Sequence, residues 1–130
     1  MPHRCVRDLV ERDAPVSAAS DTTVRVATQA MAEHVCGSIL VTEGGSLAGI
    51  FTTHDLLTGV TAAGLDPEAT SLGDVMTRDP DMLPADASIK TAARRLEELG
   101  HRCYLPVVED GCIIGVLSTS HLLLNGYPRA

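Results

Sequence analysis

The feature that most constrains this chain is an internal repeat. The stretch that begins at Asp21 recurs from Asp86, an offset of 65 residues, and the stretch that begins at Gly49 recurs from Gly115, an offset of 66. The lead-in segment 7–10 corresponds more weakly to 73–76. Two copies in one chain predict two similar units, related by a pseudo-twofold axis and burying a shared apolar surface.

Each copy shows the same succession of elements. An extended segment precedes a helix that Thr23 or Ser88 can cap, and this helix carries apolar residues at helical spacing. A hairpin rich in Ile, Val and Leu follows, and a second helix closes the copy. The expected elements are extended segments at 14–20 and 82–85, first helices at 24–35 and 89–99, strand pairs at 38–42 with 47–51 and 104–108 with 112–117, and closing helices at 53–62 and 119–124. The fold class predicted is α/β (α+β), built from tandem β-α-β-β-α repeats.

The domain organisation follows from the repeat. We expect the first copy with its lead-in at 1–65, a polar, Pro-containing connector at 66–71, and the second copy at 72–130. The chain contains one Phe, two Tyr and no Trp. The core must therefore be filled by Val, Leu, Ile, Ala and Met.

Charge and hydropathy exclude several classes of function. Seventeen acidic residues against ten basic ones give a net charge of −7, which disfavours nucleic-acid binding. The longest apolar runs are far shorter than the roughly 20 residues needed to cross a bilayer, so no membrane partner is expected. The charged N-terminal segment lacks the apolar region of a secretory signal, which predicts a cytoplasmic protein with its four cysteines as thiols.

A helix ending in Gly, a hairpin such as the Leu-Pro-Val-Val of 105–108, and then Gly-hydrophobic-x-Thr/Ser-x-x-Asp opening a helix, twice in tandem, resembles the CBS (cystathionine β-synthase) domain pair of the stand-alone two-repeat bacterial type. The resemblance covers nearly the whole chain. It implies a disc-like regulatory module that often dimerises. It also implies binding of an adenosyl compound, such as AMP, ADP, ATP or S-adenosylmethionine, in a cleft between repeats, with no cofactor required.

The candidate ligand-binding residues of the first copy are Gly49, Thr52, His54 and Asp55. Gly49 permits close backbone approach, while the Thr52 hydroxyl and the free amides of the helix that follows suit a phosphate. The Asp55 carboxylate can accept hydrogen bonds from both hydroxyls of a ribose. Protonated His54 can donate to a phosphate. The alternative for Thr52 and Asp55 is a capping box that only stabilises the helix start.

The family resemblance implies that the wall contacting the base comes from the other copy. It points to Leu83, Ala87, Cys103 and Tyr104. Tyr104 can stack on a purine, although a half-buried tyrosine is also ordinary in a strand.

The second copy departs from the motif. It keeps hydroxyls at Ser118 and Ser120, but His121 stands where the family has Asp, and a neutral imidazole offers one acceptor at most. We therefore expect a degenerate second cleft and one intact ribose contact per chain.

No catalytic or metal-binding residue is predicted. Ser118 and His121 are local neighbours without a third group to complete a nucleophilic site. The three His-x-Cys patterns, at 3–5, 34–36 and 101–103, do not occupy equivalent positions in the two copies, which argues against a zinc site.

The sequence predicts a non-catalytic ligand-sensing protein, with its effector protein unidentified. Two alternatives are a structural homodimerisation module with vestigial pockets and a metal or thiol redox sensor. We expect a homodimer because the second helices carry more apolar residues than one small unit can bury. These residues are Leu56, Leu57, Val60, Leu122 and Leu123.

Overall fold

The computed structural model describes residues 5–10, 15–34, 36–99 and 104–118. The chain divides into two compact units. One is formed by residues 16–80 and is called the central unit below, and the other is formed by residues 1–15 and 81–130 and is called the terminal unit.

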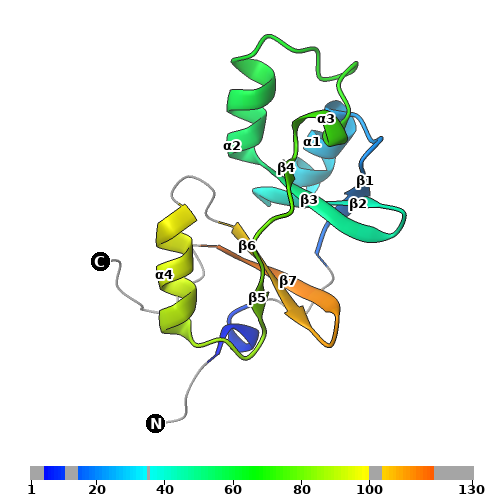
Figure 1. Cartoon of the computed structure of the whole chain (residues 1–130). Helices are drawn as coiled ribbons and strands as arrows, with labels where there is room; N and C mark the ends of the chain where they lie inside the picture. The colour runs from blue at the N-terminus through cyan, green and yellow to red at the C-terminus, as the bar shows by residue number, and fades with distance from the viewer. Residues whose placement is uncertain (1–4, 11–14, 35, 100–103, 119–130) are drawn as a thin grey trace. The chain divides into compact units, whose positions relative to one another are not determined.

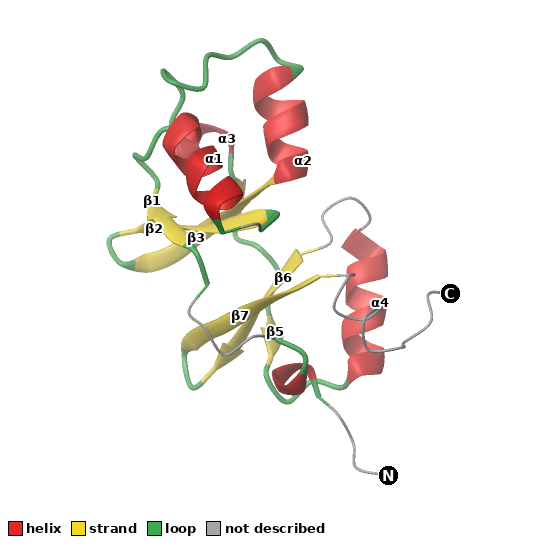
Figure 2. Cartoon of the chain, turned by 180° about the vertical axis from the view of Figure 1, so that it is seen from behind, coloured by secondary structure: helices red, strands yellow, loops and turns green. Residues whose placement is uncertain are grey.

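The central unit is a four-stranded sheet with helices on one face. Strand order is β1-β2-β3-β4, with β1 parallel to β2 and the other pairs antiparallel. Helices α1 and α2 cover the same face of this sheet (Figure 1, Figure 2). In chain order the elements are β1 (Ser17–Ala19), α1 (Val24–Glu33), β2 (Ser38–Glu43), β3 (Ser46–Thr52), α2 (Thr53–Asp55), a π-helical continuation of α2 (Leu56–Thr61), α3 (Leu72–Val75) and β4 (Thr77–Arg78).

Helix α1 forms where the sequence predicts it. The Thr23 hydroxyl accepts a hydrogen bond from the Val26 amide at 3.2 Å, which caps the helix. Its buried residues, Val24, Ala27 and Met31, belong to one apolar cluster with Ile39, Val41 and Phe51 of the strands. Helical periodicity on one side and strand alternation on the other therefore build the central core.

The terminal unit repeats this plan with three strands in the order β5-β6-β7. Strand β5 is parallel to β6, and β6 is antiparallel to β7. Its elements are a single 3₁₀ turn (Val6–Asp8), β5 (Leu83–Pro84), α4 (Ile89–Leu99), β6 (Tyr104–Glu109) and β7 (Cys112–Ser118). The predicted closing helix at 119–124 lies outside the described residues.

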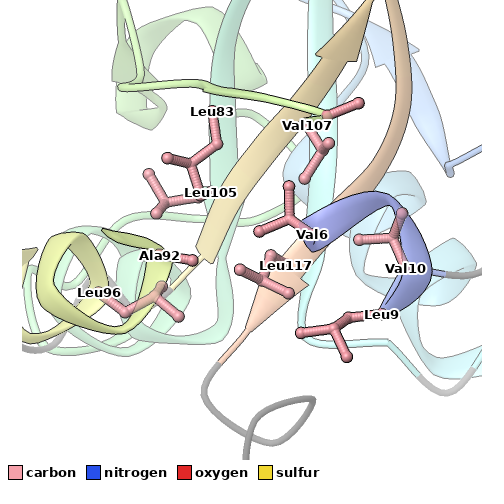
Figure 3. Packing of buried hydrophobic residues seen from close by; sticks show 10 residues of the cluster. Val6, Leu9, Val10, Leu83, Ala92, Leu96, Leu105, Val107 and Leu117 are labelled. Atoms are coloured by element: carbon pink, nitrogen blue, oxygen red, sulfur yellow. The ribbon is translucent and has the colours of Figure 1, made fainter. Parts of the chain in front are cut away.

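The terminal core is aliphatic, as the composition predicts. Figure 3 shows side chains from the 3₁₀ turn, β5, α4, β6 and β7 packed together. The cluster consists of Val6, Leu9, Val10, Leu83, Ala85, Ala92, Leu96, Leu105, Val107 and Leu117.

The lead-in of each sequence copy packs with the other copy. In the terminal unit, the amide of Val6 donates to the Ala87 carbonyl and the amide of Arg7 to the Ala85 carbonyl, both at 3.0 Å. Val6, from the first copy, is fully buried in the terminal core.

The second copy's lead-in makes the equivalent contacts in the central unit. The amide of Leu72 donates to the Thr22 carbonyl and the amide of Gly73 to the Ser20 carbonyl, both at 2.9 Å. Leu72 is fully buried in the central core. The boundaries of the compact units therefore differ from those of the sequence copies. The central unit takes residues 16–80, whereas the sequence copies are at 1–65 and 72–130.

Candidate functional site

The candidate site of the first copy is organised around Asp55, at the point where β3 passes into α2. The Thr52 hydroxyl accepts a hydrogen bond from the Asp55 amide at 3.2 Å. In return, Asp55 Oδ2 accepts hydrogen bonds from the Thr52 amide at 3.0 Å and from the Thr52 hydroxyl at 3.1 Å. This is the capping box that the sequence left as an alternative, and it fixes the carboxylate at the helix start.

The other oxygen of the same carboxylate has a different partner. Asp55 Oδ1 accepts a hydrogen bond from the Thr77 hydroxyl at 3.3 Å. Thr77 lies on β4 opposite Ile50, so its side chain shares a sheet face with the alternate β3 residues Ile50 and Thr52. A carboxylate oxygen offers about two lone-pair sites. These contacts fill both sites on Oδ2 and one on Oδ1.

Sequence reasoning missed Thr77. This residue follows the lead-in of the second copy and lies 22 positions from Asp55. The weak correspondence of 73–76 with 7–10 marks that lead-in as an element, but nothing in the sequence shows that it packs with the first copy.

Gly49 has a structural reason to be glycine. A Cβ at this position would stand 2.6 Å from the Met76 sulfur and 2.6 Å from the Thr77 carbonyl oxygen. The close backbone approach predicted for Gly49 is therefore made by β4, which pairs with β3 through Gly49 and Ile50. This approach places Thr77 beside Asp55.

The expectation that the amides at the start of α2 are free for a phosphate is wrong for two of them. The Thr53 amide donates to the Gly37 carbonyl at 3.0 Å, and the Asp55 amide donates to the Thr52 hydroxyl. His54 lies between them and is half-buried. Its role as a phosphate donor stays a prediction.

The residues expected to contact a base belong to the terminal unit. The Leu83 side chain is buried in the terminal core, so packing accounts for it without a ligand. Ala87 is half-buried and its carbonyl accepts from Val6, and Tyr104 is half-buried at the start of β6. Cys103 lies outside the described residues. The contribution of these four residues to a ligand site stays a prediction.

Only one residue of the predicted degenerate cleft is described. Ser118 is buried at the end of β7, where it corresponds to Thr52 at the end of β3. Ser120 and His121 lie outside the described residues, as do the apolar Leu122 and Leu123.

The cysteines and histidines give no support to a metal site within the described ranges. No group of three or more His, Cys, Asp or Glu side chains is found there. His34 Nδ1 donates to the Ala30 carbonyl at 2.8 Å, and the Cys36 thiol contacts the Ser38 carbonyl at 3.3 Å. Both side chains of this His-x-Cys pattern thus bind backbone of their own unit.

Arginines pair with the equivalent glutamates at the ends of β2 and β6. In the terminal unit, Arg7 forms an ion pair with Glu109, and that hydrogen bond raises the pKa of Arg7. In the central unit, Arg78 Nη1 lies 3.5 Å from a Glu43 carboxylate oxygen. Arg7 comes from the lead-in of the first copy, and Arg78 follows the lead-in of the second copy.

None of the helices in the described ranges has both the length and the apolar character needed to cross a bilayer.

Comparison with known families gives a match over most of the chain. The family model described as "CBS domain" matches twice, at residues 6–61 and 72–125. Each match lies within one of the two sequence copies and includes its lead-in.

Known relatives and structures agree with that match. The chain is 42% identical over 109 residues to the meiotically up-regulated gene 70 protein of Schizosaccharomyces pombe, covering 83% of this chain but only 15% of that protein. The crystal structure of the CBS domain protein NE2398 has a TM-score of 0.87 at 25% identity and covers 98% of this chain and 100% of that chain. The CBS domain pair of MJ0100, solved with 5′-methylthioadenosine and S-adenosyl-L-methionine, has a TM-score of 0.80 at 18% identity over 94% of this chain and 98% of that chain. At that identity the last similarity shows the fold alone.

Proposed function

Because this chain belongs to the CBS domain family and carries two copies of the domain, we propose that it is a non-catalytic regulatory module that senses an adenosyl compound. The ligands proposed are AMP, ADP, ATP or S-adenosylmethionine, held by a ribose contact at Asp55. The structure of MJ0100 with two adenosyl compounds supports this ligand class for a protein of the same fold.

One observation carries the proposal. The Asp55 carboxylate is fixed by the capping box through Oδ2, while Oδ1 accepts one hydrogen bond, from Thr77, and has room for another. A carboxylate held in place before binding loses little freedom when it accepts a hydroxyl. Protonated His54, the next residue along the helix, provides the proposed contact with a phosphate.

A thermal-shift screen tests this proposal. Purified, reduced, metal-free protein is mixed with AMP, ADP, ATP, S-adenosylmethionine and GMP. A ligand at a hundred times its dissociation constant stabilises the folded state by about 2.7 kcal/mol, which gives a measurable rise in the unfolding midpoint. We expect a rise with at least one adenosyl compound and a smaller rise with GMP. No rise with any adenosyl compound would reject the proposal.

A second proposed function is homodimerisation through the helical face of the central unit. Two large apolar side chains are exposed there, Leu57 at 61% and Val26 at 54%. They lie on the two helices that cover one face of the sheet (Figure 2). Burial of these two side chains against a partner would remove their apolar surface from water, which favours association. The proposed partner is a second copy of this chain.

Sedimentation equilibrium at micromolar concentration tests the dimer. We expect a dimer for the unmodified chain and a shift toward monomer for Leu57→Asp. The control, Ser46→Asp, places the same charge on an exposed residue at the start of β3, outside the helices, and should leave the mass unchanged. A monomeric unmodified chain would contradict the proposed dimer. It would not affect the proposed ligand, which the thermal-shift screen tests separately.

A further inference from the structure

We propose that Thr77 is a second residue that binds the ribose of the ligand. Thr77 and Asp55 together would make this site selective for ribonucleosides over deoxyribonucleosides. The inference rests on the proposed function, since it concerns the same ligand. The juxtaposition that carries it is the hydrogen bond from the Thr77 hydroxyl to Asp55 Oδ1 at 3.3 Å.

Most acceptor sites of the Asp55 carboxylate are already filled. Asp55 Oδ2 receives two hydrogen bonds from Thr52, and Oδ1 receives one from Thr77. With about two lone-pair sites on each oxygen, one site remains, on Oδ1. Asp55 can therefore accept one ribose hydroxyl without breaking its existing contacts. The second hydroxyl of the diol needs another acceptor.

The Thr77 hydroxyl supplies that acceptor. It donates its single hydrogen to Asp55, which leaves its oxygen lone pairs available to accept a hydrogen bond. The two acceptor atoms, Thr77 Oγ1 and Asp55 Oδ1, are separated by a distance comparable to that between hydroxyls on adjacent ring carbons. One hydroxyl can thus donate to each atom.

Backbone pairing and limited rotamer freedom hold Thr77 in place. Its backbone pairs with Ile50 of β3, and its side chain is β-branched, so few rotamers are open to it. The absence of a Cβ at Gly49 lets this strand approach closely. Both Thr77 and Asp55 are only half-buried, so neither is enclosed in the core.

Binding of AMP, 2′-deoxy-AMP and 3′-deoxy-AMP to the full chain, measured by calorimetry, tests the inference. The unmodified chain should bind AMP more tightly than both deoxy analogues. Thr77→Val should weaken AMP binding by about three- to tenfold, the range for a neutral hydrogen bond. The Thr77→Val chain should bind AMP and one of the deoxy analogues with similar affinities, namely the analogue that lacks the hydroxyl donating to Thr77. Thr77→Ser keeps the hydroxyl and should restore the preference.

A matched control separates this effect from general disturbance of the sheet. Thr42→Val alters a half-buried strand threonine whose hydroxyl contacts the Ala18 carbonyl, and it should leave all three affinities unchanged. Thr77→Val with an unchanged preference for AMP would overturn the role of Thr77 while the proposed function stands. An unmodified chain that binds none of the three ligands would overturn the inference, whereas the proposed function falls only if ADP, ATP and S-adenosylmethionine also fail in the thermal-shift screen.

Discussion

A Cβ added to Gly49 would lie 2.6 Å from the sulfur of Met76, closer than real side chains approach each other. These two residues belong to different sequence copies, yet they meet where β4 pairs with β3. The glycine thus permits the lead-in of the second copy to close on the sheet of the first.

Gly49→Ala should therefore destabilise the protein. Overpacking at this contact should cost about 1 to 3 kcal/mol, measured as the free energy of unfolding in urea. Gly59→Ala is the matched control, because no atom lies within 4 Å of a Cβ built there. A Gly49→Ala chain as stable as the Gly59→Ala chain would show that β4 does not pack as described.

Removing the Asp55 carboxylate should weaken the helix start. Asp55→Ala leaves the Thr52 amide without its side-chain acceptor and should cost about 1 kcal/mol of folding stability. Asp55→Asn keeps an oxygen acceptor and should cost less. Urea unfolding of both variants checks this order. The reverse order would mean that the capping box is not what stabilises this turn.

The lead-in of the second copy should behave as part of the core of the central unit. Leu72→Ala truncates a fully buried side chain and should cost about 2 to 5 kcal/mol. Leu65→Ala, at a residue 44% exposed, should change stability by about 0.5 kcal/mol or less. Amide chemical-shift changes caused by Leu72→Ala should concentrate within residues 16–80. Changes concentrated within 81–118 would contradict the exchange of lead-ins.

The Arg7–Glu109 ion pair should matter more than the exposed Arg25–Glu68 pair. The side chains of the first are 34% and 30% exposed, and those of the second 55% and 70%. Arg7→Gln should lower the midpoint of thermal unfolding more than Arg25→Gln does. Added salt should reduce the difference between the midpoints of the two variants.

The pH dependence of this effect follows from the raised pKa of Arg7. A basic group with a raised pKa contributes its full stabilisation of the folded state below its unfolded pKa, and this contribution is lost as pH rises from there through its folded pKa. Between about pH 6 and 9 arginine stays charged, so the difference between Arg7→Gln and the unmodified chain should not vary through titration of Arg7. A difference that disappears within this range would contradict the assignment.

Much of the fold was predictable because local rules decide it. Helix capping at Thr23, apolar spacing along α1 and the hairpin of β2 and β3 each depend on neighbouring residues. The repeat then predicted a second, similar unit. The exchange of lead-ins was not predictable, because the weak correspondence of 73–76 with 7–10 carries no information about which core each segment joins.

The candidate site was predictable in part for the same reason. The capping box of Thr52 and Asp55 lies within four consecutive residues, and the sequence suggested it as an alternative. The contact of Asp55 with Thr77 depends on the tertiary position of β4 and was missed. The Thr53 amide was wrongly expected to be free, since its bond to the Gly37 carbonyl crosses from one element to another.

Ribose recognition at Asp55 is tested most directly by calorimetric titration of AMP into the full chain and into Asp55→Asn. We expect one site per chain for the unmodified protein and an affinity about 10- to 100-fold weaker for Asp55→Asn, the range for a hydrogen bond to a charged group. The control is Asp74→Asn, which alters an aspartate in the lead-in of the second copy that accepts a hydrogen bond from the Ser71 hydroxyl. This variant should bind AMP as the unmodified chain does. Equal affinity of the Asp55→Asn and unmodified chains, or no binding by either, would contradict ribose recognition at Asp55.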